Sequence, residues 1–99
     1  MEAFEIYEAS GSWKNCDDDR PYVLVRLSSE GRWDCFPVSG ACYSGNCFEI
    51  PSDDPDFAAT GLKKTSHVHD ERYYQPVPKR RIGRVEGALL DRFRKYAGV

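Results

Sequence analysis

Long apolar runs are missing from this 99-residue chain. The longest, Tyr22 to Val25, has four residues, whereas a membrane-spanning helix needs roughly 20. The first residues, Met1 to Glu5, are acidic and include no apolar signal core, so a cytoplasmic protein without membrane association is expected. Hydrophobic residues make up 40% of the chain, which excludes a disordered protein, and the length fits one domain over residues 1–99.

Motifs of several catalytic and metal-binding classes are also absent. No Gly-x-Ser-x-Gly elbow occurs, which argues against a serine hydrolase. The cysteines Cys16, Cys35, Cys42 and Cys47 form no Cys-x-x-Cys pair, so no structural zinc site is expected. Free thiols are expected in a reducing cytoplasm, with Cys35 buried on a strand. Cys42 and Cys47 flank a short turn and could oxidise to each other, although nothing in the sequence requires it.

Charge is distributed unevenly, although the net charge is only −2. Residues 1–60 carry twelve acidic and four basic side chains, a balance of −8, and residues 61–99 carry ten basic and four acidic ones, a balance of +6. A basic segment on an acidic protein can form a partner surface or bind nucleic acid. Composition favours the simpler interpretation, in which the two halves pair with each other in the fold.

The pattern of apolar and turn residues predicts a mainly-β fold that ends in one helix. Short strands are expected at residues 4–8, 22–27, 32–38, 47–50, 66–69 and 73–77. From Glu86 onward, apolar residues recur every three or four positions, and Gly98 fits a C-terminal cap. Five or six short strands and a C-terminal amphipathic helix favour a small β-barrel, which leaves few strand edges exposed.

Three places along the chain carry residues suited to chemistry. Arg20 stands where a polar loop meets an apolar strand, and backbone pairing would fix its position. Ser39 and Gly40 end a strand and could hold a phosphate or an oxyanion. His67 and His69 share one strand face, as does Glu71 if the strand continues, and this set suits acid–base chemistry or a metal. A solvated strand face with no function is the competing interpretation.

The order of four motifs gives a resemblance. Arg20-Pro21 opens the apolar strand that continues to Val25, and Pro37-Val38-Ser39-Gly40 ends a later one. Thr60-Gly61-Leu62-Lys63-Lys64-Thr65-Ser66-His67-Val68 follows, and Arg81-Ile82-Gly83-Arg84-Val85 precedes the last helix. In this order the motifs resemble the MazF/PemK family of type II toxin–antitoxin ribonucleases. The resemblance covers nearly the whole chain as a single MazF/PemK-like domain, and the chain would be a divergent member.

This resemblance implies a fold, an activity and partners. The family has an SH3-like barrel with a C-terminal helix, is usually a homodimer, and is inhibited by an antitoxin protein that covers the basic groove. Its members cut single-stranded RNA, including mRNA, without a metal or cofactor, and 2′-hydroxyl attack leaves a 2′,3′-cyclic phosphate. Arg20 matches the catalytic arginine and Ser39 the assisting hydroxyl residue. His69 and Glu71 stand where some members carry a catalytic Arg and Asp.

The candidate catalytic residues are therefore Arg20, Ser39, His69 and Glu71. The candidate RNA-binding residues are Lys14, Gly40, Thr65, His67, Lys79, Arg80 and Arg81. The chain departs from the family in the acidic loop Asp17-Asp18-Asp19, which would repel phosphate unless it points away or pairs with Arg20 or Lys14.

Two other functions remain open at this stage. The first is a non-catalytic module that binds nucleic acid or a protein through Lys79, Arg80 and Arg81. Its aromatic residues would be Trp13, Trp33, Tyr43, Tyr73 and Tyr74. The second is a metal site built from His67, His69 and one or more cysteines.

Overall fold

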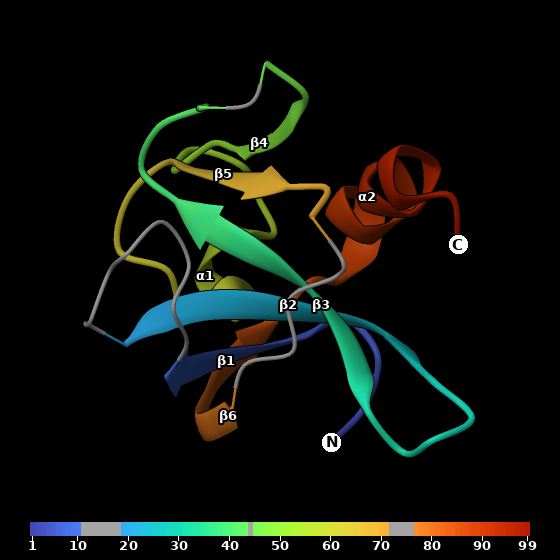
Figure 1. Ribbon diagram of the computed structural model, residues 1–99. Coiled ribbons are helices and arrows are strands. Elements are labelled where there is room, and N and C mark those ends of the chain that lie inside the picture. The colour runs from blue at the N-terminus through green and yellow to red at the C-terminus, as the bar shows by residue number, and fades with distance from the viewer. Residues whose placement is uncertain (11–18, 44, 72–76) are drawn as a thin grey trace.

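Six antiparallel strands form one sheet in the computed structural model of the chain, which describes residues 1–10, 19–43, 45–71 and 77–99. The strands are β1 (Glu5–Ser10), β2 (Arg20–Leu27), β3 (Trp33–Ser39), β4 (Cys47–Ile50), β5 (Ser66–His69) and β6 (Val77–Arg84). Their order across the sheet is β4-β5-β3-β2-β1-β6 (Figure 1). The predicted mainly-β fold is therefore confirmed.

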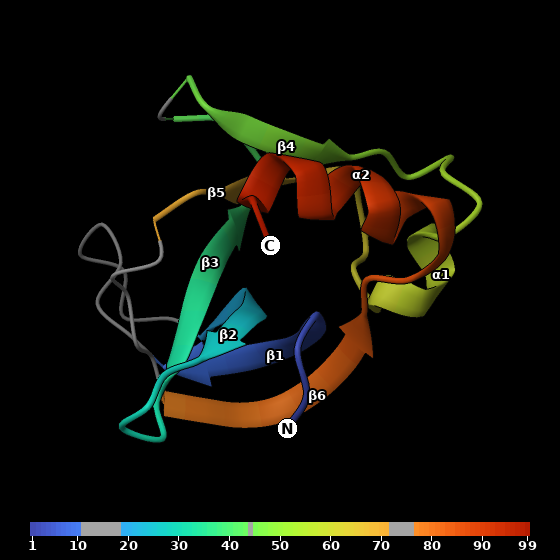
Figure 2. The ribbon, with the colours of Figure 1, turned by 90° about the vertical axis from the view of Figure 1, so that its right-hand side faces the viewer.

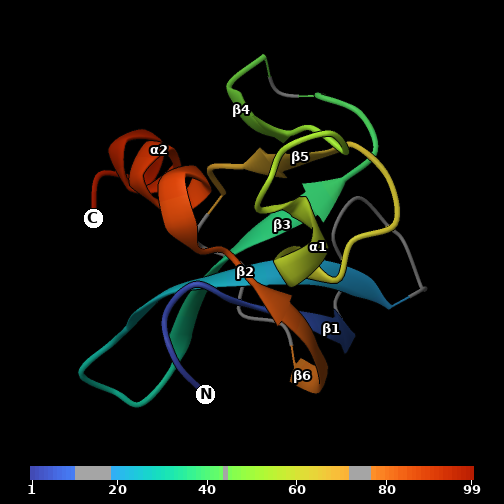
Figure 3. The same ribbon diagram turned by 180° about the vertical axis from the view of Figure 1, so that it is seen from behind.

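Two helices complete the described fold. α2 (Gly87–Ala97) lies on the concave side of the curled sheet, with β4 above it and β1, β2 and β6 below it (Figure 2). The short α1 (Phe57–Thr60) contacts β6, as the view from behind shows (Figure 3). The C-terminal helix expected from the sequence is confirmed, whereas α1 was not predicted.

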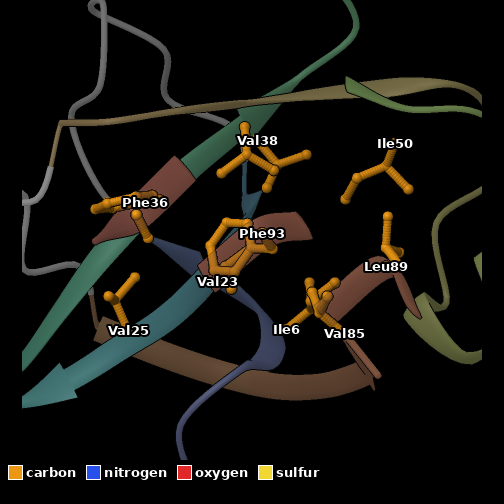
Figure 4. Packing of buried hydrophobic residues seen from close by; sticks show 11 residues of the cluster. Ile6, Val23, Val25, Phe36, Val38, Ile50, Val85, Leu89 and Phe93 are labelled. Carbon is orange, nitrogen blue, oxygen red and sulfur yellow. The ribbon is translucent and has the colours of Figure 1, made fainter. Parts of the chain in front are cut away.

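The hydrophobic core lies between the concave face of the sheet and α2. Phe93 of α2 is fully buried at its centre, with Val23, Phe36 and Val38 of the sheet nearby (Figure 4). The Phe93 ring makes edge contacts with Phe36 at 6.0 Å between centroids. Such edge-to-face pairs add to the free energy gained by burial of the rings.

The apolar stripe of α2 explains its position. Leu89, Phe93 and Ala97 recur every fourth residue and are buried, as the periodicity predicts. Gly98 ends the helix in the left-handed conformation, and its N–H donates to the carbonyl of Arg94 at 2.8 Å. The Tyr96 hydroxyl donates to the carbonyl of Asn46 at 2.8 Å. α2 is therefore fastened to the segment that leads into β4.

The expected strand at 73–77 needs a correction. β6 begins at Val77 and continues to Arg84, and residues 72–76 lie outside the described part of the chain. Pro78 had suggested the end of a strand, because proline lacks the N–H that a central strand needs. Among the described strands β6 stands at the edge of the sheet, next to β1, and an edge strand tolerates proline.

Cys35 is a free thiol buried on β3, as predicted, and burial raises its pKa to about 12. We expect iodoacetamide to leave Cys35 unmodified at pH 8 in the folded protein and to alkylate it in denaturant, since the thiolate is the reactive form. The raised pKa also means that the unfolded chain loses this proton first. The free energy of unfolding should therefore fall as the pH rises from 9 towards 12. Mass spectrometry and urea titrations measure the two effects, and rapid alkylation of the folded protein would contradict the burial.

Candidate functional site

Arg20, Ser39 and Gly40 line one pocket of about 250 Å³, together with Glu8, Lys63 and Lys64. The β2–β3 register explains the meeting of Arg20 and Ser39. Tyr22 pairs with Pro37, so the antiparallel register continues to place the first residue of β2 opposite the last residue of β3. The sequence prediction that these two residues form one site is consistent with this placement.

Ser39 lines this pocket and is hydrogen-bonded to His69, which lies behind it. Ser39 Oγ donates to the carbonyl oxygen of Ala41 at 2.6 Å and lies 2.7 Å from His69 Nε2, which is 3.2 Å from the same carbonyl oxygen. β5 pairs with β3 and brings the imidazole to this position. His69 is fully buried and Ser39 is 7% exposed. His69 therefore reaches a ligand in the pocket through Ser39 rather than directly.

The other ring nitrogen of His69 faces a disulfide. Cys42 and Cys47 are bonded to each other, so the expectation of free thiols is wrong for these two residues. β4 pairs with β5 in a register that sets Cys47 opposite His69, and Cys47 Sγ lies 3.5 Å from His69 Nδ1. The Tyr43 ring stacks on the imidazole at 6.0 Å between centroids. Cys47 and Tyr43 thus cover the histidine.

Lys63 and Lys64 also line the pocket, although they were not among the residues predicted for the site. Both belong to the segment between α1 and β5, and both are exposed. A Cβ built on Gly40 would lie 3.1 Å from Lys64 Nζ, so the ammonium group packs against the bare backbone of this glycine. A signal was present, since Lys63-Lys64 follows Gly61-Leu62 inside the motif that gave the resemblance. Whether these two lysines reach the pocket depends on the path of their loop, which the sequence alone does not show.

The loop that carries these lysines is held against β6 by Gly61. Gly61 has a φ of 71°, and a Cβ there would collide with the carbonyl group of Ile82. Only glycine fits both the left-handed conformation and the close approach. The loop therefore packs tightly on the sheet, which brings Lys63 and Lys64 to the pocket.

Two other predicted site residues have their own partners, although His67 stands directly opposite Ser39 in the β3–β5 register. His67 Nε2 is 3.4 Å from a carboxylate oxygen of Glu49, and Thr65 Oγ1 accepts a hydrogen bond from the N–H of Ser52 at 2.9 Å. β5 ends at His69, so Glu71 is not part of this strand and does not share its face with His67 and His69, as it would have if the strand continued. Lys14 lies outside the described residues.

The basic residues Lys79, Arg80 and Arg81 form ion pairs along β6. Their partners are Asp19 at 3.0 Å, Glu8 at 2.9 Å, and Glu5. Each pair joins a cation of the basic segment to a carboxylate of the acidic one, which confirms that the two charged halves pair with each other.

Glu5, the partner of Arg81, has a pKa that reflects opposing effects. Burial raises the pKa of its carboxyl group, but the hydrogen bond from the Glu2 N–H and the ion pair with Arg81 outweigh burial and lower it overall. Arg80, Arg81 and Lys63 also line a second pocket of about 300 Å³, which shares Glu8, Gly61, Lys63 and Ile82 with the first. The two pockets therefore adjoin.

The described residues contain no cluster of three or more His, Cys, Asp or Glu side chains that could hold a metal ion. His67 and His69 do not share a ligand set there. Of the aromatic residues suggested for base stacking, Trp33 is half-buried and Tyr43 is 63% exposed. Trp13, Tyr73 and Tyr74 lie outside the described residues.

No protein-family model matches the chain, and a search of curated proteins gives no match either. Within the described residues, neither helix has the length and apolar character needed to cross a membrane.

Proposed function

We propose that this protein is a metal-independent endoribonuclease of the MazF/PemK type that acts as the toxin of a toxin–antitoxin pair in the cytoplasm. Its substrate would be single-stranded RNA, and the pocket of Arg20 and Ser39 would hold the bond that is cut. One observation carries the proposal: a guanidinium, a hydroxyl backed by a buried histidine, and two lysines line the same pocket.

The electrostatics of the pocket suit a phosphodiester. Arg20, Lys63 and Lys64 supply positive charge, while Glu8 is already engaged by Arg80. A guanidinium offers planar paired donors to phosphoryl oxygens, and an ammonium acts as a compact charge. Arg20 would bind the non-bridging oxygens and stabilise the negative charge that grows there in the transition state.

Ser39 and His69 would handle the proton of the attacking hydroxyl. The ribose 2′-oxygen forms a bond to phosphorus while the bond from phosphorus to the 5′-oxygen breaks. For this step the Ser39 hydroxyl turns from the Ala41 carbonyl to His69 Nε2, 2.7 Å away, with the imidazole proton on Nδ1. The 2′-hydroxyl proton then passes to Ser39 Oγ as the Ser39 proton passes to Nε2. The 5′-oxygen leaves with a proton from water, and the products are a 2′,3′-cyclic phosphate and a 5′-hydroxyl.

The adjoining pockets support the proposal of an acidic antitoxin segment as partner. Such a segment would lie along Lys63, Arg80 and Arg81 and compete with RNA for the same cations. A homodimer belongs to the same proposal, because the MazF/PemK-type groove is formed between two copies.

A cleavage assay tests the proposed function. Purified, antitoxin-free protein is incubated with several long single-stranded RNAs in EDTA, with DNA of the same sequences as the control. We expect discrete cuts in RNA alone, with cyclic phosphate at the new 3′-ends. Intact RNA after incubation with folded protein would contradict the proposal and favour the binding module.

Lys64→Gln is expected to lower kcat/KM for RNA cleavage about tenfold, because it removes a cation that stabilises the charge of the reacting phosphate. The loss is modest because an exposed cation contributes less than a buried one. Gly40→Ala should act in the same direction, since the added Cβ displaces the Lys64 ammonium. Lys95→Gln, on the exposed face of α2, is the matched control and should leave kcat/KM unchanged. Equal values of kcat/KM for the Lys64 and Lys95 variants would show that Lys64 does not contribute to cleavage.

A further inference from the structure

Glu8 is the residue whose carboxylate lines both of the adjoining pockets. The second pocket, of about 300 Å³, is otherwise lined by Gly61, Lys63, Arg80, Arg81 and Ile82. Its volume is within the range of small-ligand sites, roughly 300–1,000 Å³. Arg80 is paired with Glu8 and Arg81 with Glu5, so most of its positive charge is already balanced. Such a pocket suits a nucleobase, which is neutral and carries hydrogen-bonding edges, better than a phosphate.

The β1–β6 register holds Glu8 beside Arg80. The two residues are direct partners across the strands, and Arg80 Nη2 lies 2.9 Å from Glu8 Oε1. The side chains are 36% and 70% exposed, respectively, so a ligand can reach both. This bond uses one acceptor site of the carboxylate, which has about four, and one of the five N–H donors of the guanidinium. The pair can therefore bind a ligand without separating.

The paired side chains present a definite row of hydrogen-bonding atoms. Oε2 and Oε1 of Glu8 are acceptors, and Nη2 of Arg80 beside them is a donor. Cytosine offers the same row of acceptor, acceptor and donor when it pairs with guanine. Guanine matches it with N2–H, N1–H and O6, whereas the other three bases set an acceptor atom beside their only donor nitrogen. A uracil, cytosine or adenine would therefore place a lone pair against the carboxylate.

We propose that the second pocket is a guanine-binding subsite, in which Glu8 accepts hydrogen bonds from N1–H and N2–H and Arg80 donates to O6. Because Glu8 and Lys63 line both pockets, the bound guanine would neighbour the phosphate held by Arg20 and Ser39. The choice of cleavage sites rests on the proposed function, whereas the binding of guanine does not.

Nucleoside monophosphates test the subsite without any cleavage. GMP, IMP and AMP share the ribose phosphate, but IMP lacks the N2 amino group, and AMP lacks N1–H and O6 as well. The backbone amide signals of Glu8, Gly61, Lys63 and Ile82 are followed by NMR of the 15N-labelled whole chain during each titration. We expect a Kd for GMP about tenfold below that for IMP, and AMP to bind more weakly still. Equal Kd values for GMP and AMP, or no shift of these signals with GMP, would overturn the proposal.

Variants separate the roles of the two side chains. Glu8→Gln keeps the size of the side chain but replaces one acceptor with a donor, so GMP should lose its advantage over IMP. Arg80→Gln should weaken the binding of GMP and IMP by the same factor, because both carry O6. Glu30→Gln removes the same charge from an exposed turn and is the matched control. A Glu8→Gln protein that still prefers GMP to IMP would contradict the role of Glu8.

Cut sites mapped in a pool of RNAs of random sequence provide the second readout. Guanine should occupy one fixed position beside every cut, and inosine at that position should lower the cleavage rate about tenfold. Cuts without a fixed guanine, or a guanine requirement that Glu8→Gln retains, would overturn the subsite and leave the proposed nuclease standing. Intact RNA together with preferential binding of GMP would overturn the proposed function and leave the subsite standing.

Discussion

Arg20→Ala is expected to lower kcat/KM for RNA cleavage about 10³-fold while the fold is retained, because it removes charge stabilisation of the transition state. The backbone of Arg20 keeps its place, since β2 pairs with β1 through Ala9 and Arg20 whatever the side chain. Circular dichroism and thermal unfolding establish that the variant is folded, and product mapping on single-stranded RNA measures the loss.

The matched control for this prediction is Arg26→Ala. Arg26 lies on the same strand, is paired with Asp34 at 3.3 Å, and stands outside the pocket. Its rate should equal that of the wild type, and Arg20→Lys should recover part of the activity, since the charge remains but the paired donors are lost. An Arg20→Ala variant that cuts as fast as Arg26→Ala would exclude a catalytic role for Arg20.

Phe93→Ala should lower the free energy of unfolding by about 3–5 kcal/mol, because it removes a fully buried ring and leaves a cavity in a packed core. The ring contacts Phe48 of β4 at 5.5 Å between centroids as well as Phe36 of β3. Its loss therefore also loosens the support of the strands that hold the Ser39–His69 pair.

Urea titration of the two proteins measures this change. Leu27→Ala is the control, because Leu27 is 53% exposed and its truncation should cost under about 0.5 kcal/mol. A Phe93→Ala variant as stable as Leu27→Ala would contradict the placement of α2 in the core.

Periodicity was enough to predict the elements whose side chains face one core. The buried residues of α2 recur at helical spacing, and Gly98 caps the helix as the sequence indicated. The strands Cys47–Ile50 and Ser66–His69 were also predicted with the observed bounds. In these segments local pattern and tertiary packing favour the same structure.

β6 could not be predicted from local pattern because its pairing compensates for an unfavourable sequence. Val77–Arg84 contains a proline and a run of cations, both unusual in a strand. The edge position tolerates Pro78, and carboxylates on and near β1 neutralise Lys79, Arg80 and Arg81. Those partners are 60, 72 and 76 residues away in sequence, so no short window contains them.

The candidate site was predicted in part. Arg20 and Ser39 were selected together from motif order, and the β2–β3 register gives a physical reason for their meeting. Lys64 and the disulfide beside His69 were missed as parts of this site. Both depend on long-range packing: Lys64 on the approach of its loop to Gly40, and the disulfide on the pairing of β4 with β5.

We propose above all that the pocket of Arg20 and Ser39 directs a 2′-hydroxyl at the neighbouring phosphate. A single 2′-deoxy nucleotide placed on the 5′ side of a mapped cut, in an otherwise unchanged RNA, tests it most directly. Cleavage in EDTA should disappear at that position and persist at every other one. Continued cleavage at the substituted position would show that water is the nucleophile and would contradict the account.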